Sequence, residues 1–375
     1  MFEILLAAMV FVLAYLNGAN DISKGIATLV GSEVVKDTRA ILLGTVTTVA
    51  GALAGIAITG GLLKTFSSGV LATPLQSTAF PIAVAFAAIG WIFFATQTGM
   101  PVSTTHALTG GIIGAALAQL GSAGIVWNVV MQKIAIPLAL SPLVSFALAW
   151  LLFPIIRKSL AGVNDYCICV ELQQTRLIPV MQSSSVQAMA AVPESAELHV
   201  IADKSEVCEQ NVALSGVKLR IADSLHVLTS GLTSFARGMN DTPKIAALLL
   251  GISLLGGIST SFLFGFVALG MCAGSLLGGR KVLATLSKKI TPMDGLEGFT
   301  ANLGASALVT MATFLGLPLS TTHVTTSAIV GIGVRARGGA NWRIVREIAL
   351  AWIVTLPTAA ILSYLAATAM QRFGF

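Results

Sequence analysis

Long apolar runs alternate with short polar stretches along most of the chain. Runs with few or no charged residues lie at positions 2–16, 40–63, 79–95, 105–120, 124–156, 245–278, 299–315, 324–334 and 347–371. A helix needs about 20 mostly apolar residues to cross a bilayer, and backbone groups in lipid must be paired within the protein. The pattern therefore predicts an all-α polytopic membrane protein.

Composition agrees with this class. The chain is 55% hydrophobic and 10% charged, with a mean hydropathy of +0.88, which leaves too little polar surface for a soluble protein. The run 2–16 has Glu3 as its single charge and no basic start, so we expect a retained helix, not a signal peptide. The net charge of +6 is expected to reflect loop residues that set membrane orientation, with no nucleic-acid partner.

One polar segment interrupts the apolar pattern. It alternates in a β-like manner at residues 166–172 and 198–201. We expect this organisation: membrane repeat 1 at residues 1–156, a cytoplasmic loop or small β-rich insert at 157–221, and membrane repeat 2 at 222–375.

Two polar motifs occur twice. The pattern G-x-N-D-x-x-K spans Gly18–Lys24 and recurs at Gly238–Lys244. The octapeptide GMPVSTTH ends at His106, and its close copy GLPLSTTH ends at His323. Two unrelated motifs that recur in the same order, at nearly the same distance along the chain, indicate an internal duplication.

Basic residues predict the orientation of the two halves. The positive-inside rule places clusters of lysine and arginine in the cytoplasm. These clusters are Arg157 and Lys158; Arg280, Lys281, Lys288 and Lys289; and Arg335, Arg337, Arg343 and Arg346. Tracing the spans between them predicts a multi-pass protein of the cell (inner) membrane with both termini outside and the loop 157–221 inside. The two halves are then inverted-topology repeats, as in many secondary transporters.

The duplicated motifs carry charges within apolar surroundings. A charge at the bilayer centre costs about 2.5–3.5 kcal/mol, which argues for a function. Glycine weakens helices and Asn and Asp cap them, so each G-x-N-D is expected to end one membrane helix and begin a half-helix. Gly-x-Pro followed by Ser-Thr-Thr predicts a second break in each half. Four helix N-termini would then converge near the midplane around one tetrahedral anion.

Other interpretations of these residues stay open. Ser and Thr also join membrane helices to one another, and the glycine-rich runs 251–257 and 274–279 are typical of close helix packing. His106 and His323 are packing residues or proton carriers. Lys24 and Lys244 either contact the anion or neutralise the neighbouring aspartates as buried pairs.

With both motifs, the chain resembles the inorganic phosphate transporter (PiT) family, as a divergent member of bacterial type. The resemblance rests on Gly18–Lys24 and Gly238–Lys244, and on Pro101–His106 and Pro318–His323. It implies a dimeric symporter that imports phosphate with Na⁺ or H⁺ and has no other cofactor. The implied phosphate ligands are Asn20, Asp21, Asn240, Asp241, Ser103, Thr104, Thr105, Ser320, Thr321 and Thr322, to which Lys24 and Lys244 are added. The implied sodium ligands are Asn20, Asp21, Thr105, Asn240, Asp241 and Thr322.

The sequence departs from the family pattern at two positions. Lys24 stands where the family usually has a second Asn, and Asn302 ends a segment, 298–302, that usually ends in Glu. Both changes make the site more positive. We hypothesise that Lys24 stands in for one coupling cation.

Several functions remain as alternatives. Hydrogen phosphate has an O–H donor that a carboxylate accepts, which favours phosphate over sulfate, but a sulfate or other tetrahedral oxyanion permease stays open. An anion channel needs a continuous pore with several weak sites, which one charged midplane site does not favour. An enzyme is not expected, because no acid is evident that orients a base beside Ser103 and His106.

Overall fold

The structure is a computed structural model that describes residues 2–73, 77–162, 166–172, 177–180, 188–191, 198–204, 217–250 and 258–373. The chain divides into two compact units. One contains residues 1–155 and 226–375 and is helical. The other contains residues 156–225 and includes the strands.

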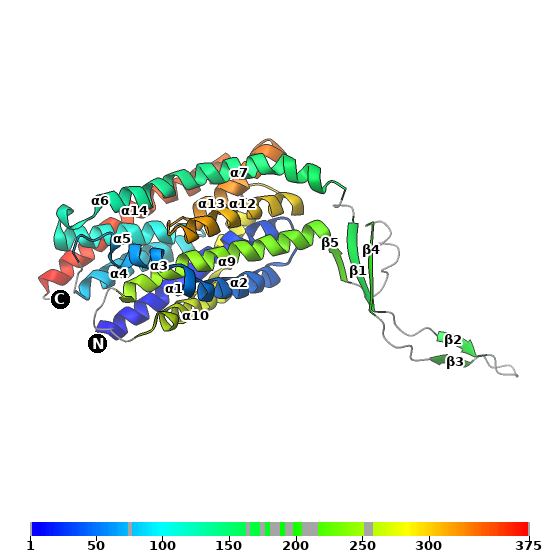
Figure 1. Cartoon of the computed structure of the whole chain (residues 1–375), viewed down its shortest axis with the longest axis horizontal. Coiled ribbons are helices and arrows are strands. Elements are labelled where there is room, and N and C mark those ends of the chain that lie inside the picture. The colour runs from blue at the N-terminus through cyan, green and yellow to red at the C-terminus, as the bar shows by residue number, and fades with distance from the viewer. Residues whose placement is uncertain are drawn as a thin grey trace. The chain divides into compact units, whose positions relative to one another are not determined.

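The helical unit is a bundle of long helices (Figure 1). The first half holds α1 (Phe2–Gly31), α2 (Asp37–Ile58), α3 (Gly60–Lys64), α4 (Ala79–Gln97), α5 (Thr104–Leu120), α6 (Trp127–Val129) and α7 (Ile136–Leu160). The second half holds α9 (Ile221–Leu250), α10 (Thr260–Gly278), α11 (Arg280–Lys288), α12 (Gly295–Phe314), α13 (Thr321–Arg337) and α14 (Trp342–Arg372). Both chain ends lie at one end of this bundle, and α7 finishes at the other (Figure 1).

Six helical stretches in the described part of the chain are long and apolar enough to cross a membrane. They are Phe2–Gly31, Asp37–Ile58, Ala79–Gln97, Trp127–Leu160, Thr260–Gly278 and Trp342–Arg372. Large apolar side chains on their outer faces are exposed, such as Leu277 at 78% and Ile353 at 70%. Exposed apolar surface of this extent suits contact with lipid, and the predicted all-α polytopic membrane fold is confirmed.

Glycines let the helices of the two halves approach closely. A Cβ atom at Gly274 of α10 would lie 1.8 Å from the carbonyl oxygen of Tyr15 in α1. At Gly278 it would lie 2.6 Å from the Cβ of Ala19. The close packing predicted for the run 274–279 is therefore confirmed. The run 251–257 lies outside the described residues.

The G-x-N-D motifs do not interrupt their helices, so the predicted breaks there are wrong. α1 continues through Gly18 and α9 continues through Gly238. A Cβ at either glycine would lie 2.1 Å from a carbonyl oxygen of a neighbouring helix, that of Met271 or of Thr48. Both glycines therefore serve close contact between helices, which a sequence motif does not distinguish from a break.

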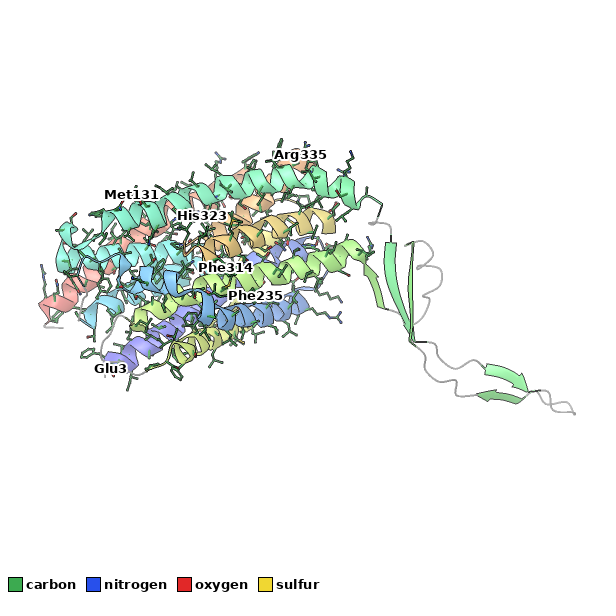
Figure 2. The ribbon with its side chains drawn as sticks, viewed as in Figure 1. Glu3, Met131, Phe235, Phe314, His323 and Arg335 are labelled. Carbon is green, nitrogen blue, oxygen red and sulfur yellow. The ribbon has the colours of Figure 1, made fainter. Side chains whose placement is uncertain are left out.

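The breaks predicted at Gly-x-Pro are confirmed. α4 ends at Gln97 before α5 begins at Thr104, and α12 ends at Phe314 before α13 begins at Thr321. Gly99 and Gly316 have φ values of +71° and +67°, which favour glycine. The motifs therefore supply two helix N-termini, those of α5 and α13, and not four. In Figure 2, Phe314 and His323 lie about midway along the bundle, so one such break is near its middle.

Among its described residues, the second unit contains two small antiparallel sheets. The strands are β1 (Tyr166–Leu172), β2 (Leu177–Val180), β3 (Ala188–Ala191), β4 (Leu198–Lys204) and β5 (Val217–Arg220). One sheet has the order β4-β1-β5, with Tyr166 opposite Lys204, and the other pairs β2 with β3. β1 and β4 occupy the two stretches with β-like alternation.

Candidate functional site

The ammonium group of Lys24 lies among oxygen atoms from two segments. Its Nζ donates to Oδ1 of Asp21, one turn earlier on α1, in a close buried ion pair. It also donates to the carbonyl oxygen of Val102 at 2.9 Å and to Oδ1 of Asn20 at 3.3 Å. The spacing i, i+3 places the aspartate and the lysine on one helix face, as the sequence predicts. We call these groups the first cage.

Lys244 has an equivalent environment in the second half. Its Nζ donates to Oγ1 of Thr105 at 2.7 Å, to the carbonyl oxygen of Leu319 at 2.9 Å and to Oδ1 of Asp241 at 3.0 Å. Oδ1 of Asn240 is a further acceptor. Lys244 and Asp241 occupy the same motif positions as Lys24 and Asp21, and Leu319 precedes Ser-Thr-Thr as Val102 does. We call these groups the second cage.

The two motif asparagines orient their side chains in the same way. Nδ2 of Asn20 donates to Oγ1 of Thr96 and to the carbonyl oxygen of Met100, both at 3.1 Å. Nδ2 of Asn240 donates to Oγ1 of Thr313 at 2.8 Å. Each amide nitrogen is thereby engaged by the segment before Ser-Thr-Thr, which directs the amide oxygen at the lysine.

Reciprocal hydrogen bonds join the starts of α5 and α13. Oγ1 of Thr105 donates to the carbonyl oxygen of Leu319 at 3.0 Å. Oγ1 of Thr322 donates to the carbonyl oxygen of Val102 at 2.8 Å. In each half, a threonine thus donates to the carbonyl group that accepts from the lysine of the other half. These hydrogen bonds hold the two octapeptides together.

The serines of the octapeptides begin the two helices. Oγ of Ser103 accepts from the amide N–H of His106, and Oγ of Ser320 accepts from that of His323, each at 3.2 Å. Ser, Thr, Asp and Asn are the preferred residues at such N-cap positions, since their side-chain oxygen pairs an otherwise free amide. Thr321, the counterpart of Thr104, is buried at the first position of α13.

Asn17 connects the two carboxylates. Its Nδ2 donates to Oδ2 of Asp21 and to Oγ1 of Thr104, both at 3.0 Å, and to Oδ2 of Asp241 at 3.3 Å. The aspartates of the two halves are therefore adjacent at a common centre between the two cages. Asn17 is absent from the site that the sequence predicts.

Arg237 is the counterpart of Asn17 in the second half and is also absent from the predicted site. It lies one turn before Asp241 on α9 and is 1% exposed. Its Nη2 donates to Oγ1 of Thr48 at 2.8 Å. Both residues stand four positions before an aspartate of the motif. On an unbroken helix this spacing places them on the same face as the aspartate, so it could have identified them only if the helix had been predicted to continue.

Comparison with known proteins identifies the family. The model of a family described as phosphate transporters matches residues 17–363. The chain belongs to this phosphate transporter family. The resemblance that the duplicated motifs indicated is thereby confirmed.

Relatives in the phosphate transporter family match nearly the whole chain. A protein of Haemophilus influenzae named a putative phosphate permease is 30% identical over 93% of this chain and 92% of its own. Two further relatives are named probable low-affinity inorganic phosphate transporters. The protein of Bacillus subtilis is 27% identical over 94% of this chain and 92% of its own. The protein of Rhizobium meliloti is 28% identical over 96% of this chain and 94% of its own. A solved structure of a protein named the sodium-dependent phosphate transporter matches with a TM-score of 0.77, at 20% identity, over 99% of both chains. This last likeness shows the fold.

The histidines of this phosphate transporter family member lie beside the cages in a separate pocket. The rings of His106 and His323 are 4.6 Å apart between centroids, and the ring of Trp352 is 4.1 Å from that of His323. All three line a pocket of about 360 Å³ whose other walls are mostly apolar. The cage hydrogen bonds that the structure describes do not include either imidazole.

Asn302, the second departure from the family pattern, also lies outside the cages. Its Nδ2 donates to Oγ1 of Thr28 and to Oγ of Ser230, both at 2.7 Å. These contacts join α12 to α1 and α9. Asn in place of the family's usual Glu therefore changes the polar contacts between α12, α1 and α9, and not the immediate contacts of Lys24.

Proposed function

We propose that this protein imports inorganic phosphate across the cell membrane by symport with a cation, sodium or proton, through alternating access. The family, and the names of its relatives, support phosphate as the substrate. The observation that carries the proposal is a buried polar centre to which both halves contribute matching contacts. A centre shared equally by two repeats suits a site to which either side of the membrane has access in turn.

The proposed phosphate ligands are residues of the two duplicated motifs. Thr104 and Thr321 begin α5 and α13, where helix N-termini favour anions. Asp21 and Asp241 have carboxylates that can accept the O–H of hydrogen phosphate. The complete proposed set is Asn20, Asp21, Lys24, Ser103, Thr104, Thr105, Asn240, Asp241, Lys244, Ser320, Thr321 and Thr322.

The proposed sodium ligands overlap with the cages. They are Asn20, Asp21, Thr105, Asn240, Asp241 and Thr322. Carboxylate, amide, hydroxyl and carbonyl oxygens are groups that hard cations prefer, and the same groups receive the two ammonium nitrogens here. We therefore extend the hypothesis made for Lys24: each lysine serves as a tethered cation, so transport needs fewer sodium ions or only protons.

The arrangement of broken helices supports inverted repeats at 1–156 and 222–375. α5 runs toward the end of the bundle that holds the chain termini (Figure 1). α13 runs from the middle, where His323 lies, toward the other end, which Arg335 marks in Figure 2. The two equivalent helices thus run in opposite directions. By the positive-inside rule, the basic residues near Arg335 favour the cytoplasm for that end of the bundle, with the termini outside. Arg157 and Lys158 favour the cytoplasm for the insert that follows them in the chain. A homodimer is proposed from the family resemblance.

Uptake of labelled phosphate into proteoliposomes tests this function. Sodium and proton gradients are imposed separately, with unlabelled sulfate as competitor. Uptake that one gradient drives and excess sulfate leaves unchanged supports a phosphate symporter. Competition by sulfate supports the second candidate, an oxyanion permease. The observation that favours this candidate is the pairing of both carboxylates with lysines, which neutralises them. Flux without coupling, together with single-channel currents, contradicts alternating access.

A further inference from the structure

We propose that Arg237 binds the transported oxyanion directly and supplies the unpaired positive charge that attracts it. This inference rests on the proposed function and names a ligand outside the predicted site. It follows from the burial of the guanidinium, its free donors, its position and the charge of its surroundings.

The guanidinium of Arg237 is buried, and most of its donors have no partner among the residues that the structure describes. The side chain is 1% exposed, and its described partner is the hydroxyl of Thr48. Within the residues that the structure describes, Nε and Nη1 have no hydrogen-bond partner. A buried charge without a counter-ion is strongly unfavourable, and the described ion pairs do not include Arg237, so this group calls for an anion when the site is in use.

The position of Arg237 places it at the common centre. Arg237, Asp241 and Lys244 follow one another at intervals of four and three residues on α9, which puts them on one helix face. The guanidinium interacts electrostatically with both Asp21 and Asp241. Neither carboxylate forms a described ion pair with it; their described ion pairs are with the lysines.

The charges at this centre do not balance. The cluster contains two carboxylates, Asp21 and Asp241, and three cations, Lys24, Lys244 and Arg237, all buried. Each lysine is paired with its own aspartate, so Arg237 is the positive charge in excess. An anion that enters the centre removes this imbalance.

The amide oxygen of Asn17 is an acceptor suited to the same oxyanion. Nδ2 of Asn17 donates to oxygens of both aspartates, which fixes the orientation of its amide because carboxylates only accept. Its Oδ1 is then a buried acceptor with no partner in the described part of the chain. Equivalent positions of the two halves thus hold an acceptor in Asn17 and donors in Arg237, all without a partner among the described residues. Hydrogen phosphate offers charged oxygens to the guanidinium and an O–H to the amide oxygen.

The choice of arginine favours a tetrahedral oxyanion over a halide. A planar guanidinium donates two parallel hydrogen bonds to phosphate or sulfate, whereas an ammonium acts as a point charge. An Arg237→Lys variant therefore keeps the charge but loses this paired geometry. An Arg237→Gln variant loses both.

The test is equilibrium binding of labelled inorganic phosphate to the purified full-length protein, repeated with labelled sulfate. Arg237→Gln is expected to weaken phosphate binding about 10- to 100-fold, since a charged hydrogen bond is lost. Arg237→Lys is expected to be intermediate. The control Thr48→Val removes the described partner of Arg237 and leaves its charge, so binding is expected to stay within about threefold. Thermal melting of each variant establishes that it is folded.

The outcomes separate the role of Arg237 from the proposed function. Unchanged phosphate affinity in Arg237→Gln overturns the role of Arg237 and leaves the proposed function intact. If Arg237→Gln does not fold, Arg237→Lys with wild-type affinity overturns it instead. Sulfate binding without phosphate binding in the wild type, lost in Arg237→Gln, supports the role of Arg237 and contradicts phosphate as the substrate. A wild-type protein that binds neither anion contradicts both proposals.

Discussion

The ammonium nitrogen of Lys244 lies 2.7 Å from the hydroxyl oxygen of Thr105, a residue 139 positions earlier in the chain. The same hydroxyl donates to the carbonyl oxygen of Leu319, which also contacts Lys244. A cation in the second half is therefore held in part by the first half. Any movement that separates the starts of α5 and α13 would break the contact between Thr105 and Lys244.

Replacing the cage lysines is expected to create sodium dependence. In Lys24→Asn and Lys244→Asn the oxygen ligands remain, but no tethered cation offsets the buried carboxylate. We expect phosphate uptake without sodium to fall at least about tenfold, because an unpaired buried charge costs several kcal/mol, and sodium to restore it. Initial uptake rates into proteoliposomes over a range of sodium concentrations measure this.

Lys281→Asn is the matched control, because this lysine is exposed and bonds to Gln97 at 2.7 Å. Its sodium dependence is expected to equal that of the wild type. An unchanged ion requirement in both cage variants contradicts the role of the lysines as tethered cations.

The reciprocal threonine bonds are expected to stabilise the contact between the two halves. Thr105→Val and Thr322→Val each leave a buried carbonyl group, of Leu319 or Val102, without its hydroxyl donor. The expected loss in unfolding free energy is about 1–3 kcal/mol each, and uptake falls as well. Thermal melting and uptake are measured on the same preparations.

Serine at either position provides the control, since Thr105→Ser and Thr322→Ser keep the hydroxyl. Both are expected to retain most of the stability and uptake of the wild type. Equal losses in the valine and serine variants mean that the methyl group, and not the hydrogen bond, is the important feature.

Gly274 is expected to be intolerant of any side chain. In Gly274→Ala the new Cβ lies 1.8 Å from the carbonyl oxygen of Tyr15, so α1 and α10 must separate. Overpacking of this kind costs about 1–3 kcal/mol or more. At Gly265, on the same helix, a Cβ would have no neighbouring atom within 4 Å. Gly265→Ala is therefore expected to be neutral, or more stable by up to about 1 kcal/mol from helix propensity.

Melting temperatures of the two glycine variants are compared in one detergent. A large drop for Gly274→Ala beside no drop for Gly265→Ala supports the close approach of α1 and α10. Equal melting temperatures contradict it.

The N-cap serines are expected to matter for transport as well as for stability. Ser103→Ala and Ser320→Ala each release the amide N–H of a histidine at the start of α5 or α13. Each change costs about 1 kcal/mol and alters the helix start that faces the proposed anion site. We expect KM for phosphate to rise severalfold, measured as uptake against phosphate concentration.

Ser259 offers the matched cap, because its Oγ accepts from the amide N–H of Phe262 at 3.2 Å at the exposed start of α10. Ser259→Ala is expected to lose a similar stability with no change in KM. A change in KM of the same size in all three variants assigns the effect to stability alone.

The sequence by itself determined features that depend on neighbouring residues. Apolar runs of membrane length identify helices because lipid provides no partners for free backbone groups. The breaks at Gly99 and Gly316 follow from Gly-x-Pro and the serine caps, and the pairs Asp21–Lys24 and Asp241–Lys244 follow from helical spacing. The recurrence of the two motifs could be recognised from their order and spacing.

Only the tertiary structure decided which role each motif residue has. Gly18 and Gly238 serve close contact and not helix ends, since the atoms that approach them, in Met271 and Thr48, are distant in sequence. The helix therefore continues, and its face one turn before the aspartates carries Asn17 and Arg237. Their surroundings come from helices of both halves, so no local pattern distinguishes a buried guanidinium without a described ion pair from one that faces solvent.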